Sequence, residues 1–130
     1  MSAIMEKLIK EATTHTPLAD FDPSGRLKLE GRSFPENVAQ FFDPLIDFVK
    51  NIEMDTVRFD VNLEYFNTAS SKKMMDLFKH LDANSHVQSI LIHWHYEEGD
   101  DDSLETAEIF EESLLRCEFI YHEYVENTLD

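Results

Sequence analysis

Three side-chain hydroxyls lie close together at Thr68, Ser70 and Ser71. Hydroxyls in such a cluster can do one of two things. A Ser or Thr oxygen can cap a helix by accepting a hydrogen bond from an unpaired backbone N–H. Alternatively, a kinase can phosphorylate one of them, which adds about −1.5 to −2 charges at neutral pH. Both interpretations place these residues at the start of a helix.

The flanking residues support a strand-to-helix junction at this point. Residues 56–66 alternate between apolar and polar side chains, which predicts a half-buried strand. Residues 69–82 place apolar side chains at steps of three and four, which predicts an amphipathic helix. Asn67 or Thr68 is therefore expected at the N-cap, and the hydroxyls of the first turn are expected to be exposed.

Residues 64–72, with the sequence EYFNTASSK, resemble the signature of the SiaC family of bacterial regulatory phosphoproteins. Members of that family carry a modifiable Thr in an Asn-Thr-Ser-Ser setting. Residues 31–37 (GRSFPEN) resemble a second family block, and residues 93–96 (HWHY) with the acidic run 97–102 resemble a third. The resemblance covers about residues 16–122. Ala69 departs from it, because the family usually has Ser there, and Gly99 interrupts the acidic run.

The resemblance implies that Thr68 accepts a phosphate. Lys72 and Lys73 would then compensate the new charge. Tyr65 and Phe66 either form an apolar rim that a partner covers or pack the end of the strand. The implied partner-binding residues are Tyr65, Phe66, Asn67, Ser70, Ser71, Lys72 and Lys73.

The resemblance also implies a non-enzymatic signalling adaptor that changes partners with its phosphorylation state. The cytoplasm is the expected location, because the single Cys gives no support for secretion. The implied partners are a kinase with a histidine-kinase-like ATP site, an opposing metal-dependent phosphatase, and in some systems a diguanylate cyclase. Such a cyclase would connect the chain to cyclic-di-GMP and biofilm formation. The implied fold is similar to that of the anti-sigma-factor antagonists, which are small sheet-and-helix domains.

Composition narrows the function classes independently of any resemblance. A chain of 130 residues suits one domain, and its net charge of −16 disfavours nucleic acid and anionic lipid surfaces as partners. The single Cys117 cannot form an internal disulfide.

The N-terminal residues lack the apolar core of a signal peptide and the length of a membrane span, so we expect no membrane insertion. With only three Gly, no phosphate-cradling loop is expected, and no cofactor is predicted.

The order of elements predicts an α/β fold with a mixed, about five-stranded sheet and crossover helices. Residues 1–12 are expected to form an N-terminal helix, residues 13–125 the sheet-and-helix core, and residues 126–130 a polar tail. The run Ser33-Phe34-Pro35-Glu36 matches a capping box and predicts a helix that begins there.

An alternative function is a small ligand- or metal-binding domain that phosphorylation does not control. His93 and His95 are two residues apart on a predicted strand, share a face, and could bind a metal with His122 or a carboxylate. The acidic run 97–102 lacks the spacing of an EF-hand loop, which favours a solvated loop that caps the next helix. Catalysis has little support, because no Gly-x-Ser-x-Gly elbow surrounds the serines.

Overall fold

The computed structural model describes residues 5–126, which form a two-layer α/β domain. Within this range the strands are β1 (Leu8–Lys10), β2 (Leu18–Phe21), β3 (Arg26–Ser33), β4 (Met54–Phe66), β5 (Val87–Glu97) and β6 (Cys117–Tyr124). The helices are α1 (Val38–Asn51), α2 (Thr68–Asp82) and α3 (Asp101–Ser113). The α/β class is confirmed, with six strands in the sheet instead of about five.

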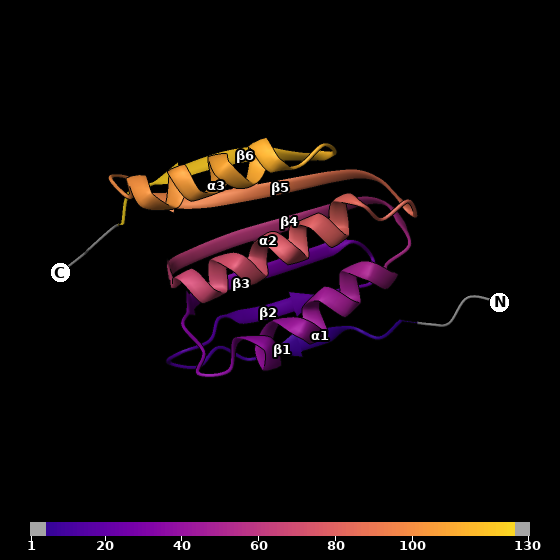
Figure 1. The fold of residues 1–130 in the computed structure, drawn as a ribbon, viewed down its shortest axis with the longest axis horizontal. Coiled ribbons are helices and arrows are strands. Elements are labelled where there is room, and N and C mark those ends of the chain that lie inside the picture. The colour runs from indigo at the N-terminus through magenta and orange to yellow at the C-terminus, as the bar shows by residue number, and fades with distance from the viewer. Residues whose placement is uncertain (1–4, 127–130) are drawn as a thin grey trace.

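The strands lie side by side in chain order, from β1 to β6. β1, β2 and β3 pair antiparallel, whereas β3, β4, β5 and β6 pair parallel. Each parallel connection passes through a helix, and the right-handed rule for such crossovers places consecutive helices on the same side. All three helices therefore cover one face of the sheet (Figure 1), and the other face is open.

The core lies between the helices and the covered face of the sheet. β4 alternates as its sequence predicts, with Val57, Phe59 and Val61 fully buried. The Phe59 ring contacts the edges of Phe21 and Phe78 at centroid distances of 5.4 and 5.7 Å. These contacts tie β2, β4 and α2 into one core, which fixes where α2 begins relative to the sheet.

The predicted N-terminal helix is wrong for the described part of that segment, and residues 1–4 lie outside the described residues. Leu8–Lys10 form strand β1, which pairs with β2. An isolated helix of 12 residues is marginal in water, so pairing with a neighbouring strand decides the conformation. Lys10 then lies over the Phe41 ring of α1, 5.0 Å from its centroid.

The predicted capping box is also wrong, because Ser33 belongs to β3 and is completely buried. Helix α1 begins at Val38, and its cap is Asn37, whose Oδ1 accepts a hydrogen bond from Gln40 N at 3.0 Å. Ser33 instead bonds the α2 turn, a contact between residues far apart in the chain. The helix continues through Pro44 to Asn51.

No helix within residues 5–126 is long and apolar enough to cross a membrane.

Candidate functional site

The first turn of α2 starts where β4 ends, and Asn67 is its cap. The Asn67 backbone is extended, and its Oδ1 accepts a hydrogen bond from Ser70 N at 2.9 Å. Its carbonyl oxygen accepts from Ser71 N at 3.0 Å. The expectation of a cap at Asn67 or Thr68 therefore resolves to Asn67.

Ser70 is buried, so the expectation that the whole first turn exposes its hydroxyls is wrong at this residue. The Ser70 hydroxyl donates to the Ser33 carbonyl oxygen at 3.1 Å and lies 2.8 Å from Ser33 Oγ. Asn67 N also donates to the Ser33 carbonyl oxygen at 3.0 Å. These bonds fasten the α2 turn to the end of β3.

Thr68 is the hydroxyl residue of this turn that the structure leaves exposed. It occupies the first helical position, and the cap hydrogen bond to Ser70 is made by Asn67 instead of by Thr68. Ser71 is half-buried. A modification of Thr68 would therefore leave both the cap and the buried serine contact intact.

A cleft of about 310 Å³ opens beside Thr68, between the first turns of α2 and α3. It is lined by Glu64, Tyr65, Phe66, Asn67, Thr68, Ser71, Asp100, Asp102, Ser103 and Thr106. Three of these described residues are acidic and none is Lys or Arg. The cleft is therefore a negatively charged environment for anything attached to Thr68.

The two predicted compensating lysines differ in their surroundings. Lys73 Nζ lies 2.7 Å from Asp43 Oδ1, so this ammonium bridges α2 and α1. Lys72 is exposed and lies one helical turn after Thr68. Compensation of a new charge by Lys73 would require the loss of an existing ion pair.

Tyr65 and Phe66 point to opposite sides of the strand end. The Tyr65 side chain is 49% exposed and contacts the edge of the Phe34 ring, 5.8 Å away between centroids. Phe66 contacts the Trp94 ring edge-on at 6.0 Å and packs against the core. Tyr65 thus belongs to the surface, while Phe66 packs the strand end.

The acidic run positions the second wall of the cleft. Asp100 caps α3, since its Oδ1 accepts a hydrogen bond from Ser103 N at 3.1 Å. The Ser103 hydroxyl accepts from Trp94 Nε1 at 3.0 Å in a buried contact. Within the cleft, Asp100 thus has the helix-capping role predicted for the acidic run.

The histidines lie on the open face of the sheet. His95 Nε2 is 3.0 Å from Asp60 Oδ1, and His93 Nδ1 is 2.7 Å from His122 Nε2. In the part of the chain that the structure describes, no group of three or more His, Cys, Asp or Glu residues is placed to hold a metal ion.

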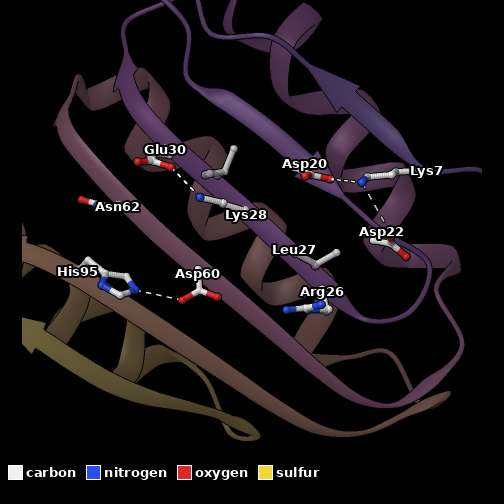
Figure 2. A pocket seen from close by; sticks show the side chains of 11 residues that line it. Lys7, Asp20, Asp22, Arg26, Leu27, Lys28, Glu30, Asp60, Asn62 and His95 are labelled. Atoms are coloured by element: carbon white, nitrogen blue, oxygen red, sulfur yellow. Dashed lines mark hydrogen bonds and ion pairs between the residues drawn. The ribbon is translucent and has the colours of Figure 1, made fainter.

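A groove of about 440 Å³ on the same face includes His95 and Asp60, as Figure 2 shows. Its charged side chains largely pair with one another, as in the contact of 2.8 Å between Lys28 and Glu30. Lys7 Nζ similarly lies 3.4 Å from Asp20 Oδ1. Because these charged side chains already form ion pairs with one another, the groove gives no specific support to the alternative of a ligand-binding site.

Sequence reasoning missed the residues that complete the site from other segments. Ser33 was assigned to a helix cap, although the GRSFPEN block that contains it did point to this part of the chain. Glu64 and Thr106 line the cleft without any sequence signal. Their role follows from strand order, which places the ends of β4 and β5 side by side.

Comparisons with known proteins agree with the resemblance. The family model described as "SiaC family regulatory phosphoprotein" matches residues 10–124. An uncharacterized protein of Pseudomonas aeruginosa (strain UCBPP-PA14) is 35% identical over 120 residues, which cover 88% of this chain and 93% of that protein.

Two solved structures are similar over nearly their whole length. SiaC of Pseudomonas aeruginosa is 30% identical with a TM-score of 0.80, over 92% of this chain and 100% of that one. The second, from a crystal structure of the diguanylate cyclase SiaD in complex with its activator SiaC from Pseudomonas aeruginosa, is 31% identical with a TM-score of 0.78, over 90% and 99%. The family match spans nearly all of the described fold, including the α2 turn and both walls of the cleft, and this chain therefore belongs to the SiaC family of regulatory phosphoproteins.

Proposed function

We propose that this chain is a non-enzymatic adaptor in the cytoplasm that binds different partners according to whether Thr68 is phosphorylated. The observation that carries the proposal is the position of Thr68. Thr68 is an exposed residue that lines a cleft, while Asn67 makes the cap and Ser70 makes the buried contact. A phosphate can therefore be added and removed without breaking a bond that holds the turn.

The charges around Thr68 explain how a phosphate would change binding. The start of a helix favours a nearby anion by about 0.3–1 kcal/mol, which helps the domain tolerate the phosphate. The cleft residues Glu64, Asp100 and Asp102 are already acidic. A dianion among them makes this surface strongly negative, and Lys72 is the exposed cation one turn away.

A partner that covers the cleft in one state would lose affinity in the other. Setting like charges against each other in an interface costs several kcal/mol, and each 1.4 kcal/mol changes affinity about tenfold. The exposed Tyr65 ring offers such a partner an apolar contact directly beside the charge. The electrostatic effect on the interface therefore exceeds the effect of the phosphate on the fold.

The family membership supports three kinds of partner. A kinase and a phosphatase would add and remove the phosphate on Thr68. The solved complex between the P. aeruginosa cyclase SiaD and its activator SiaC supports a diguanylate cyclase as the target. This chain would then control cyclic-di-GMP synthesis and, through it, biofilm formation.

Phosphopeptide analysis of the chain from its native cells tests the modification. We expect phosphate on Thr68 in at least one growth condition, and no modification of the Thr68→Ala variant. Ser113→Ala is the matched control, since it removes an exposed hydroxyl at the end of α3 that does not line the cleft, and it should leave phosphorylation at Thr68 unchanged. Absence of phosphate on Thr68 in every condition would count against the proposal.

A pull-down from the same cells tests the change of partners. Unmodified chain and chain carrying phosphothreonine at position 68 should capture different proteins, with a diguanylate cyclase in one set only. Phosphothreonine is preferred to Thr68→Asp, because a single carboxylate imitates a dianion poorly. Identical captured sets in both states would contradict the adaptor function even if Thr68 is phosphorylated.

A further inference from the structure

Three histidine rings stack across the last two strands of the sheet, on the open face away from the helices. His122 of the edge strand β6 pairs with His95 of β5, and its ring also contacts the ring of His93. Its ring is nearly parallel to those of His93 and His95, at centroid distances of 5.0 and 4.6 Å. The stack therefore spans the pairing between β5 and β6.

The bond between His93 and His122 limits how many protons the stack can hold. Their facing nitrogens, Nδ1 and Nε2, are 2.7 Å apart. Such a bond needs one nitrogen with a hydrogen and one with a free lone pair. One of the two rings must therefore remain neutral, and a second proton would place two N–H groups against each other.

The surroundings add to the cost of that second proton. His93 is 8% exposed, and burial together with the Arg58 guanidinium lowers its pKa. Asp60, which would favour a charged ring, already bonds Arg58 and His95 at 3.0 Å. The other titratable groups near the stack on the open face include Lys28 and Glu30 of β3, Glu64 of β4, Glu97 of β5, and Glu118 and Tyr124 of β6.

We propose that His93, His95 and His122 form a proton-operated clasp between β5 and β6. The clasp holds β6 on β5 while at least one ring of the hydrogen-bonded pair His93 and His122 is neutral. It loosens β6 when both rings of that pair are protonated. β6 is the edge strand, so in the sheet it pairs with β5 alone. Its release would affect the cleft, because the Tyr124 carbonyl oxygen accepts a hydrogen bond from Glu98 N at 2.7 Å. Glu98 leads directly into Asp100 and the cleft wall. The clasp does not depend on whether Thr68 is phosphorylated.

Hydrogen exchange of the backbone amides, followed by NMR on the whole chain, tests the clasp. Protection factors are compared because they remove the intrinsic effect of pH on exchange. If opening takes up one proton, protection of the β6 amides should fall about tenfold per pH unit below about pH 6.5. Amides in the middle of β4 should change much less over the same range.

Two variants show whether the histidine pair causes this behaviour. In His122→Gln the amide can still hydrogen bond to His93 but cannot be protonated, so the pH dependence of the β6 protection should become clearly weaker than in the unmodified chain. His80→Gln is the matched control, since His80 is exposed on α2, and it should behave like the unmodified chain. Comparing each variant with itself at two pH values removes any constant loss of stability.

The ring signals of the unmodified chain give a test that needs no variant. The ring of His93 should take up a proton only below the ordinary pKa of histidine, because it is buried and faces the Arg58 guanidinium. Protonation of His93 at the ordinary value would overturn the clasp. Equal pH dependence of β6 protection in the unmodified chain and in His122→Gln would overturn it as well, because carboxylates would then be the cause.

Discussion

Ser33 Oγ and Ser70 Oγ lie 2.8 Å apart, and both residues are completely buried. The two serines are 37 positions apart in the chain and join the end of β3 to the first turn of α2. Because Thr68 lies two residues before Ser70, this contact determines where the proposed phosphorylation site is held relative to the sheet. It separates the hydroxyl that fixes the turn from the hydroxyl that is free to react.

The Ser70→Ala substitution should destabilise the domain, because it leaves the Ser33 hydroxyl buried without its partner. We expect a loss of about 1–3 kcal/mol in the free energy of unfolding, measured by urea denaturation. Ser71→Ala removes a half-buried hydroxyl from the same turn and should cost less than about 0.5 kcal/mol. Equal losses in the two variants would show that the buried pair contributes nothing specific.

Removing the cap and removing the Thr68 hydroxyl should have clearly different effects. Asn67→Ala deletes the oxygen that accepts from Ser70 N and should cost about 1 kcal/mol of unfolding free energy. Thr68→Ala should change it by less than about 0.5 kcal/mol. The same urea denaturation checks both. If Thr68→Ala cost as much as Asn67→Ala, the threonine would be a structural cap and its exposure would carry less weight.

The elements that sequence could predict are those with a strong local pattern. Residues 57–63 of β4 alternate between buried and less buried side chains, and α2 has apolar residues on one face. The predicted strand, helix and junction at Asn67 are therefore confirmed. Leu8–Lys10 has no such pattern, and only pairing with β2 makes it a strand.

The geometry of the candidate site depended on contacts that no local pattern encodes. The Ser33 hydroxyl could either cap a helix or hydrogen bond to Ser70. Only the folded sheet, which places Ser33 beside the first turn of α2, decides for the bond to Ser70. Lys73 looked available for a phosphate, yet it pairs with Asp43, 30 residues earlier in the chain. Long-range pairing decides which of the adjacent polar residues remain free.

Asp82 should stabilise the domain in a pH-dependent way. Its carboxylate accepts hydrogen bonds from three consecutive backbone N–H groups where β6 begins, namely those of Leu115, Arg116 and Cys117. Burial of the carboxyl raises its pKa, but these N–H groups outweigh burial, and the pKa of Asp82 lies below its ordinary value. The ionised form is therefore the one that the fold favours.

The sign of the effect follows from this lowered pKa. The stabilisation is present above the pKa of the unfolded chain, about 3.9, and is lost as pH falls through the lower folded value. Asp82→Asn should cost about 1–2 kcal/mol at about pH 7, since the site is partly exposed, and much less at about pH 2.5. Urea denaturation at both pH values measures this. The control is Asp76→Asn, on the exposed side of α2, which should change the free energy of unfolding equally at the two pH values. If Asp82→Asn lowered the free energy of unfolding by the same amount at both pH values, the ionised carboxylate would not be the source of the stabilisation.

The acidic wall of the cleft should raise the second pKa of a phosphate on Thr68, because like charges disfavour the dianion. Asp102 lines the cleft with Thr68, so Asp102→Asn should lower that pKa relative to the unmodified sequence. We expect a shift of about a few tenths of a pH unit at low ionic strength, which shrinks as salt is added. Phosphorus NMR of chain carrying phosphothreonine at position 68, titrated through about pH 6, measures the shift directly.

The control for this titration is Glu105→Gln, which removes one acidic charge from an exposed position of α3 that does not line the cleft. It should leave the phosphate pKa nearly unchanged. Lys72→Gln should act in the opposite direction to Asp102→Asn, because it removes the exposed cation one turn after Thr68. If Asp102→Asn and Glu105→Gln shifted the pKa equally, only the net charge of the chain would matter. The phosphate would then project into solvent, and a partner would have to recognise it without the cleft.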